Sequence, residues 1–274
     1  MSAISGQDIG FTGGRRLVGL LAAGALLAPL ISAVWLPAFA QPAAYHHFAD
    51  QRSCLGVPHA ANVLSNLPFL LVGALGLAFT LGGWRRANPA AFADTRSTVP
   101  WTGLFAGVAL TMVGSSYYHW NPNDATLVWD RLPMALGFAG LVAGTLADRA
   151  TLRLASALFV ALAVVAIGSV IAWSINGNLM PYLVMQAGFI VVALIATAVL
   201  PSRFSHGNAF YAAAAFYGGA FLLERFDWEV KALTGGFVSG HTLKHLAAAM
   251  AVFVIYLMLK RRSPRSQAAG AQAS

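Results

Sequence analysis

Apolar residues along this chain gather into eight stretches, separated from one another by short polar or turn-forming segments. The stretches cover residues 16–38, 60–82, 100–119, 129–147, 151–173, 178–200, 207–224 and 237–259. Each is close to the ~20 residues that an α-helix needs to cross a bilayer. The pattern predicts an all-α membrane protein, with a seven-transmembrane helix bundle and one extra helix or signal anchor at the N-terminus.

The segments between the stretches carry residues that favour turns. These segments contain Gly82-Gly83, Asn121-Pro122-Asn123, Asn176-Gly177, Pro201 and Gly235-Gly236. Pro68, Pro133 and Pro181 fall inside or at the edge of predicted helices. Membrane helices tolerate proline where neighbouring helices satisfy the freed backbone groups.

The composition supports a membrane location and leaves no room for a sizeable soluble domain. Hydrophobic residues make up 58% of the 274 residues and charged residues only 9%, against roughly 25% charged in a soluble domain. We therefore expect one membrane domain over residues 41–262, preceded by an N-terminal segment (1–40) and followed by a flexible cytoplasmic tail (263–274).

The positive charges predict the orientation, because cytoplasmic loops are enriched in Lys and Arg. With eight crossings, twelve fall on one side: Arg15, Arg16, Arg85, Arg86, Arg96, Arg149, Arg153, Arg203, Lys260, Arg261, Arg262 and Arg265. Five fall on the other: Arg52, Arg131, Arg225, Lys231 and Lys244. Both termini are thus expected in the cytoplasm. The net charge of +8 is explained by orientation, and no nucleic-acid partner is expected.

Two interpretations of the first stretch stay open. Arg15 and Arg16, an apolar run and then Ala38-Phe39-Ala40 resemble a secretory signal with a cleavage site before Gln41. The run is longer than most signal cores, which favours an uncleaved anchor. In either case residue 41 begins outside. An Ala-, Gly- and Leu-rich chain with more Arg than Lys is typical of GC-rich bacterial genomes, so the bacterial inner membrane is the expected location.

Ionisable residues inside a membrane span are functional candidates, because they are costly unless paired or ligated. His241 and His245 are four residues apart in HTLKH, which places both imidazoles on one helix face. On its own, this spacing leaves two alternatives open. The histidines could share a metal ion, or they could face water or be hydrogen-bonded in a core. His119 ends the third stretch, and eight crossings bring it to the same outer face of the membrane.

Two further polar residues are expected at the same depth, near the outer face of the membrane. Asp130 begins the fourth stretch, and Ser115 lies four residues before His119, on the same helix face. Three neutral histidines leave one open tetrahedral position, as in catalytic zinc sites. Asp130 could then act as general base and acid, and Ser115 as an oxyanion donor. The alternatives are an ion pair of Asp130 with a neighbour such as Arg131 or Arg225, and back-bonding of Ser115 to its own helix.

These residues resemble the motifs of the alkaline ceramidases, within the wider group of seven-helix membrane hydrolases. The matching pieces are NVLSNLPFLL at 62–71, Ser115 with His119, Asp130 with the following Leu-Pro-Met, and His241 with His245. The resemblance covers about residues 42–262. It implies a seven-helix bundle that holds zinc and hydrolyses the amide of ceramide to a sphingoid base and a fatty acid.

The chain departs from the family in one place. The resemblance implies an acidic calcium-binding segment before the first family helix, yet Asp50 is the only carboxylate between Asp8 and Asp94. Calcium prefers six to eight oxygen ligands, so tight calcium binding is not expected. His46, His47, Asp50 and His59 could form a second transition-metal site; the favoured alternative is that they pack as polar loop residues over the pocket mouth.

The leading hypothesis is a zinc-dependent membrane amidase acting on ceramide or a ceramide-like N-acyl lipid. The alternative is a receptor or lipid sensor in which zinc is structural and turnover is absent. Cys54 is the only cysteine, so an intramolecular disulfide is excluded. Residue spacing does not encode acyl-chain length or oligomeric state.

Overall fold

The computed structural model describes residues 6–82, 88–149 and 155–265, with side chains from residue 14 onward in the first helix. All regular secondary structure in this part of the chain is helical, which confirms the predicted all-α class. The long helices are α1 (Gly6–Trp35), α3 (Leu67–Thr80), α4 (Val99–Trp120), α5 (Asp124–Ala147), α6 (Ala155–Asn176), α7 (Met180–Val199), α8 (Ala209–Arg225) and α10 (Gly240–Arg261). The short ones are η1 (Ala43–His46), α2 (Ala60–Leu64), η3 (Pro89–Ala91), η4 (Arg96–Thr98) and α9 (Asp227–Leu233).

Seven of the described segments are long and apolar enough to cross a membrane. They are Gly14–Trp35, Ala60–Thr80, Arg96–Trp120, Asp124–Ala147, Ala155–Asn176, Met180–Val199 and Gly240–Arg261. The second comprises α2 and α3, which are separated at Ser65 and Asn66 because Pro68 restricts the backbone at the start of α3.

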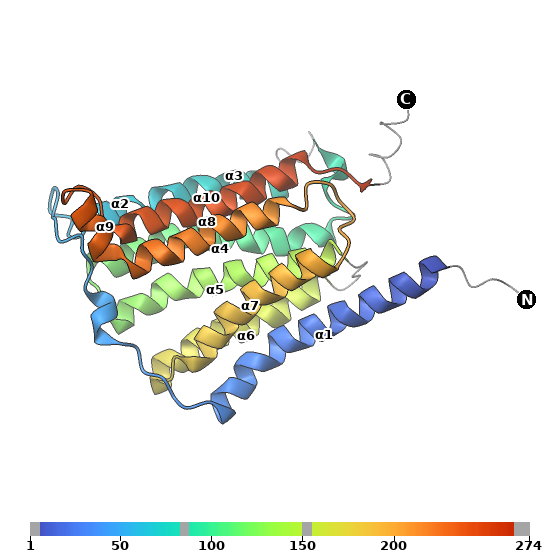
Figure 1. Ribbon diagram of the computed structural model, residues 1–274, viewed down its shortest axis with the longest axis horizontal. Coiled ribbons are helices and arrows are strands. Elements are labelled where there is room, and N and C mark those ends of the chain that lie inside the picture. Colours follow the sequence, from blue (N-terminus) through green and yellow to red (C-terminus); the bar gives the residue numbers. More distant parts are fainter. Residues whose placement is uncertain (1–5, 83–87, 150–154, 266–274) are drawn as a thin grey trace, which may run out of the picture.

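The eighth predicted stretch is α8, whose 17 residues extend about 26 Å at 1.5 Å per residue. It lies alongside α10 (Figure 1). Near its start, the Ser205 amide donates to the Ser263 carbonyl at 2.9 Å, and its last turn meets the first residue of α10. α8 therefore runs between the same two ends of the bundle as α10.

The first helix lies against α6 and α7 at one side of the molecule (Figure 1). Its described beginning and the end of α10 lie at the same end of the bundle, as an even number of crossings requires. The predicted tail 263–274 lies outside the described residues from 266 onward. Pro29 is accommodated inside α1.

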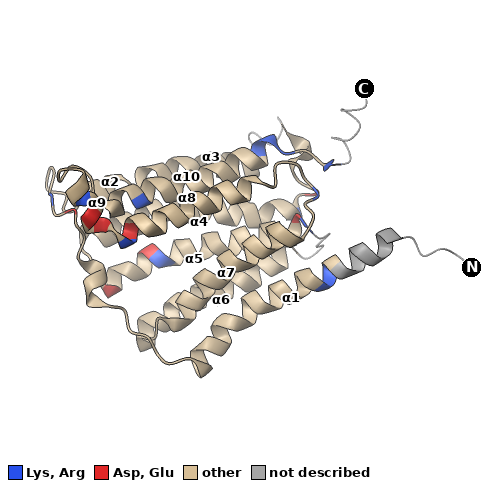
Figure 2. Cartoon of the chain, viewed as in Figure 1, with Lys and Arg blue, Asp and Glu red and all other residues tan. Residues whose placement is uncertain are grey.

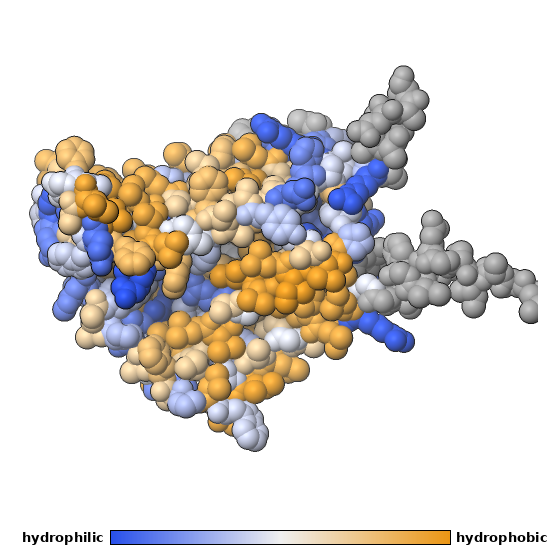
Figure 3. All heavy atoms as spheres, viewed as in Figure 1, coloured by the Kyte–Doolittle hydropathy of each residue, from blue (hydrophilic) through white to orange (hydrophobic). Residues whose placement is uncertain are grey.

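The charged residues gather at the two ends of the bundle (Figure 2). Apolar side chains cover much of the lateral surface between them (Figure 3). Six of the nine carboxylates belong to the end that contains α9 and the start of α10: Asp50, Asp124, Asp130, Glu224, Asp227 and Glu229. This apolar side surface is what a bilayer requires, and it agrees with the predicted integral membrane protein.

At the opposite end, the last turns of α5 and α10 are joined by a buried ion pair. Arg262 Nη1 donates to the Asp148 carboxylate, and Arg262 Nε donates to the Ala91 carbonyl at 2.5 Å. The guanidinium lies 4.2 Å from the ring centroid of Phe204 and 4.9 Å from that of Phe92. Burial raises the pKa of the Asp148 carboxyl, against the opposing effect of the Arg262 charge.

Two close helix contacts depend on glycine and determine where functional side chains lie. A Cβ atom on Gly114 would come within 2.0 Å of the Trp129 carbonyl oxygen, so α4 and α5 approach to backbone contact. A Cβ atom on Gly240 would lie 2.1 Å from the Leu223 carbonyl oxygen, which brings the start of α10 against α8. Such small-residue contacts are typical of helix packing in membranes.

Candidate metal centre

Three histidines from two helices converge at the end of the bundle that contains α9. His119 lies in the last turn of α4, while His241 and His245 occupy the first two turns of α10. Their ring centroids are 4.8 Å (119–241), 5.0 Å (119–245) and 4.9 Å (241–245) apart. One nitrogen from each ring lies within 4.8 Å of the others, and all three residues are buried. The predicted convergence of residues more than a hundred positions apart is confirmed.

The hydrogen bonding of these rings fits a metal ion. His119 Nδ1 and His241 Nε2 are buried and have no hydrogen-bond partner. Unsatisfied buried polar atoms are rare because each costs about 1–3 kcal/mol. Lone pairs of neutral imidazoles are the ligands that zinc and similar divalent metals prefer. The triad can therefore hold a metal ion, and its chemistry is compatible with zinc without identifying it.

Ser65 engages Nδ1 of His245. The Ser65 oxygen lies 2.9 Å from the Asn62 carbonyl oxygen and 2.7 Å from His245 Nδ1. Nε2 is therefore the nitrogen of His245 available to an ion. An ion on Nε2 requires the ring proton on Nδ1, where it can donate to Ser65. Metal-binding histidines commonly donate their other ring N–H in this way.

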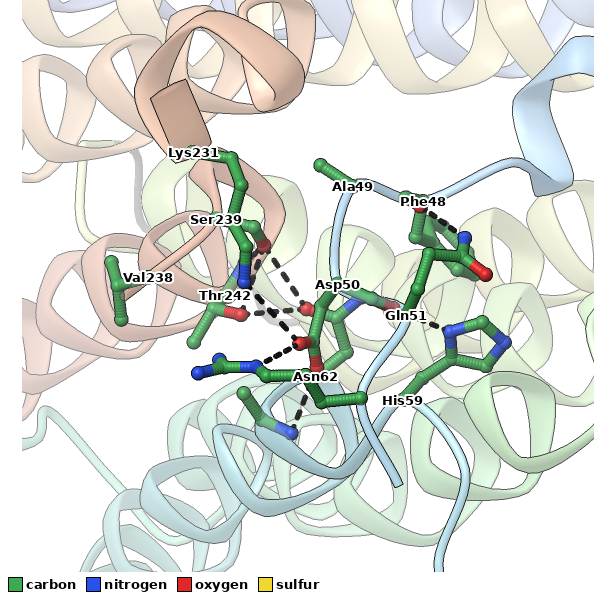
Figure 4. Close-up of polar contacts among 12 residues, drawn as sticks. Phe48, Ala49, Asp50, Gln51, His59, Asn62, Lys231, Val238, Ser239 and Thr242 are labelled. Atoms are coloured by element: carbon green, nitrogen blue, oxygen red, sulfur yellow. Dashed lines mark hydrogen bonds and ion pairs between the residues drawn. The ribbon is translucent and has the colours of Figure 1, made fainter. Parts of the chain in front are cut away.

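The start of α10 is held in register by polar contacts that cross to α2. Ser239 is the N-cap of α10 and accepts from the Thr242 amide at 3.1 Å. The Thr242 hydroxyl donates to Asn62 Oδ1 at 2.7 Å, and all three side chains are buried (Figure 4). Gly235 and Gly236, both at positive φ, turn the chain from α9 into this cap. These contacts fix the direction in which His241 and His245 point.

The loop of residues 48–50, here called the Phe48 loop, closes over the triad. The Phe48 ring centroid lies 4.6 Å from the rings of both His119 and His241. Asp227 ties this loop to α10, because Oδ2 accepts from the Ala49 amide at 2.8 Å and Oδ1 from the His241 amide at 2.6 Å. The triad is consequently shielded from solvent in this conformation.

Asp130 and Ser115 lie together at the same end of the bundle as the triad. Asp130 is buried in α5 at the α4–α5 contact made by Gly114, and Ser115 of α4 lies close enough to interact with its carboxylate. Neither Arg131 nor Arg225 forms an ion pair with Asp130 among the described residues. The ion pair considered as an alternative for Asp130 is thus not formed.

A partly buried ion pair next to the triad was not predicted from the sequence. Lys244 Nζ donates to Glu224 Oε1, which also accepts from the Tyr45 hydroxyl at 3.0 Å and lies 3.9 Å from His241 Nδ1. A lysine between two candidate ligands and a glutamate at the end of an apolar stretch are themselves unusual in a membrane protein. These two unusual placements were the feature of the sequence that could have predicted the ion pair.

Three of the four residues considered for a second metal site contact other groups, and the fourth is exposed. His46 contacts the Tyr118 hydroxyl at 2.9 Å through Nδ1 and Asp124 Oδ1 at 3.0 Å through Nε2. His47 is exposed. His59 Nδ1 contacts the Asp50 carbonyl oxygen at 2.6 Å. Among the described residues, the triad is the only group of His, Cys, Asp or Glu placed to hold a metal.

The Asp50 carboxylate is buried and satisfied by the protein itself (Figure 4). It accepts from Arg52 Nε and from the Ala61 amide, both at 3.0 Å, and Lys231 Nζ lies 3.6 Å away. Burial on its own raises the pKa of this carboxyl, but these hydrogen bonds and positive charges outweigh it and leave the pKa lowered. Asp50 thereby links the loop before α2 to α9.

A cleft of about 270 Å³ lies on the other side of α4 from Asp130, between α4 and the α2–α3 segment. It is lined by Val63, Leu64, Leu67, Met112, Ser116, Tyr117 and Trp120. Its lining contains none of the three histidines, so it is not itself the metal site. Its apolar character suits a hydrocarbon chain at the side of the bundle.

Comparison with known proteins returned no match: neither a protein-family model nor a curated protein sequence corresponds to this chain. The resemblance to the alkaline ceramidases therefore rests on the motifs alone.

Proposed function

We propose that this protein is a zinc-dependent membrane amidase that hydrolyses the N-acyl bond of ceramide or a ceramide-like lipid. The observation that carries the proposal is the buried histidine triad, two of whose ring nitrogens have no hydrogen-bond partner, with a buried carboxylate and a hydroxyl at the same end of the bundle. His119, His241 and His245 would hold the ion. When bound, zinc polarises an acyl carbonyl and makes water more acidic.

In this proposal Asp130 moves the protons. Its carboxylate accepts a proton from the attacking water and later delivers it to the departing amine, which leaves a fatty acid and a sphingoid base. Burial in α5 keeps the carboxylate near the triad and away from bulk water.

The Ser115 hydroxyl would adopt two orientations in such a reaction. Its hydroxyl lies close to the Asp130 carboxylate in this conformation, where it can orient the base. To stabilise an oxyanion, the hydroxyl would rotate towards the triad, one helical turn away at His119. The proposal assigns Ser115 both roles at successive stages.

Hydrolysis of labelled ceramide by purified protein tests the amidase. We expect fatty acid release that stops on zinc removal and returns on zinc addition. Asp130→Asn should lower kcat by roughly 10²–10⁴-fold while zinc content is retained, and His245→Ala should lose both. Arg225→Gln, at an exposed position of the same end, serves as the control. Release that persists in zinc-free protein or in His245→Ala would refute the mechanism.

The covered triad favours a second candidate, a receptor or lipid sensor with structural zinc. Phe48 lies on two of the histidines, and a closed site is typical of structural metals. This candidate predicts a large fall in thermal stability on zinc removal and no turnover of any lipid amide. Phe48→Ala separates the two, because opening the loop should raise turnover in an amidase and leave a sensor inactive.

We further propose that the protein lies in a bacterial inner membrane with the triad on the extracytoplasmic side. The charge count along the chain supports this orientation. Cys54, which is exposed in the loop before α2 at the triad end, provides a natural probe. A membrane-impermeant maleimide should label it in intact spheroplasts. Cys54→Ser with Asn208→Cys, at the opposite end, should resist labelling until the membrane is opened; the reverse pattern would invert the topology.

A further inference from the structure

Arg131 is a buried cation, in the half of the bundle nearer the triad, that the proposed reaction does not use. It is 5% exposed, and its guanidinium carbon lies 4.4 Å from the ring centroid of Trp173, 4.8 Å from that of Tyr182 and 5.7 Å from that of Tyr45. Nη2 donates to Gln41 Oε1 at 2.6 Å. Helices α5, α6 and α7 and the segment after α1 thus form an aromatic cage around one positive charge.

No anion contacts this charge directly. Arg131 forms no ion pair with any described carboxylate, and Nη1 is buried without a hydrogen-bond partner. The carboxylate of Asp130, the preceding residue, interacts electrostatically with Arg131 but leaves Nη1 unpartnered. Buried charges in proteins are normally paired. The free Nη1 donors therefore mark a place for a negatively charged oxygen.

A continuous row of side chains joins this cage to the metal triad. Tyr45 packs against the Arg131 guanidinium, and its hydroxyl donates to Glu224 Oε1 at 3.0 Å. The same oxygen accepts from Lys244 and lies 3.9 Å from His241 Nδ1. The cage and the triad are therefore two ends of one polar region inside an apolar bundle.

We propose that Arg131 Nη1 binds a carboxylate or phosphate on the amine side of an N-acyl lipid whose amide lies at the triad. The planar guanidinium matches these anions in geometry, and the surrounding rings hold it by cation–π contact while excluding water. This inference rests on the proposed amidase function and narrows its substrates from neutral ceramides to lipids with an anionic head.

Binding of matched lipids to the purified protein tests the anion site without requiring turnover. The probes are N-dodecanoylglycine, its uncharged methyl ester and dodecanoate, measured by calorimetry in a neutral detergent. We expect the glycine conjugate to bind roughly 10- to 100-fold more tightly than its ester, as for a hydrogen bond to a charged group. Arg131→Gln should abolish this preference and leave ester binding unchanged. Arg225→Gln, an exposed arginine, should keep the preference.

The outcomes separate this inference from the amidase proposal. Equal affinity of the wild type for conjugate and ester would overturn the anion site, and so would a preference that survives in Arg131→Gln. Dodecanoate binding as tightly as the conjugate, with the same loss in Arg131→Gln, would assign the site to the fatty acid product and overturn the head-group assignment. A carboxylate preference without turnover of any lipid amide would refute the amidase alone. If Arg131→Gln does not fold, Arg131→Lys is the alternative variant. Lysine keeps the positive charge but lacks the paired donors of the planar guanidinium, so this variant should retain part of the preference for the glycine conjugate over its ester.

Discussion

Ser65 is the residue that determines which nitrogen of His245 faces the other two histidines. Replacing it with alanine removes the acceptor for Nδ1–H, so the ring loses both its fixed tautomer and its orientation. We expect Ser65→Ala to weaken zinc binding by roughly 10- to 100-fold, as for other supporting partners of metal ligands. Competition with a chelator of known affinity would measure the change.

Ser116→Ala is the matched control for this prediction. Ser116 also donates to a backbone carbonyl of α2, that of Val63 at 3.4 Å, but it contacts none of the histidines. Its replacement should leave zinc affinity unchanged. Equal affinities of Ser65→Ala and the wild type would show that Ser65 does not orient the ligand.

Single residues differ in how far the sequence predicts their place. The four-residue spacing of His241 and His245 fixes their common helix face, and the depth of His119 follows from counting crossings. Ser65, Asp227 and Phe48 could not be assigned in this way. Their positions depend on loops and helix contacts that have no periodic pattern.

At the scale of elements, the contact between α4 and α5 positions both Ser115 and Asp130. Gly114→Ala would place a methyl group 2.0 Å from the Trp129 carbonyl oxygen, so the helices must separate. We expect a loss of about 1–3 kcal/mol in stability and a lower kcat, measured by thermal unfolding in detergent and by amide hydrolysis.

Gly188→Ala in α7 provides the comparison, because nothing lies within 4 Å of the added methyl group. This variant should match or exceed the wild type, since alanine favours helix by about 1 kcal/mol over glycine. If both variants behave alike, the close contact does not control the position of Asp130.

The helices themselves were largely predictable, and their boundaries were less so. Each of the eight apolar stretches corresponds to a helical segment of the structure. α5 begins at Asp124 rather than 129 because Asn123 and Thr126 form a capping box, which an apolar pattern does not register. The division between α2 and α3 at Asn66 was likewise hidden inside one apolar run.

At the scale of the whole molecule, the Asp148–Arg262 pair joins α5 and α10 at the end opposite the triad. Asp148→Asn would leave the Arg262 charge buried without its carboxylate, and we expect a loss of about 3–5 kcal/mol in stability. Arg262→Met combined with Asp148→Asn should recover part of this loss, because the Arg262 charge is then removed together with its partner. Thermal unfolding of the three proteins in detergent measures both effects.

Zinc content should be unchanged in all three proteins, because the pair contacts none of the triad residues. A double variant no more stable than Asp148→Asn would show that the ion pair itself, and not an uncompensated charge, accounts for the loss. The arrangement of helices around this pair could not be predicted, since hydrophobic patterns specify which segments cross a membrane but not their neighbours.

One carboxylate, that of Asp227, holds both the cover of the triad and the first turn of the helix that supplies two of its ligands. Access to a metal ion bound by the triad and retention of that ion would therefore be coupled, and by reciprocity an ion that tightens α10 would also keep the entrance shut. A substrate that opens the loop would also loosen α10. The metal ion would then dissociate from the triad most readily at the moment when substrate has access to it. Hydrogen exchange at residues 48–50 should accelerate when zinc is withdrawn from the wild type, and Asp227→Asn should abolish that response while speeding zinc loss to a chelator. An unchanged response in Asp227→Asn would mean that the loop and the helix open independently.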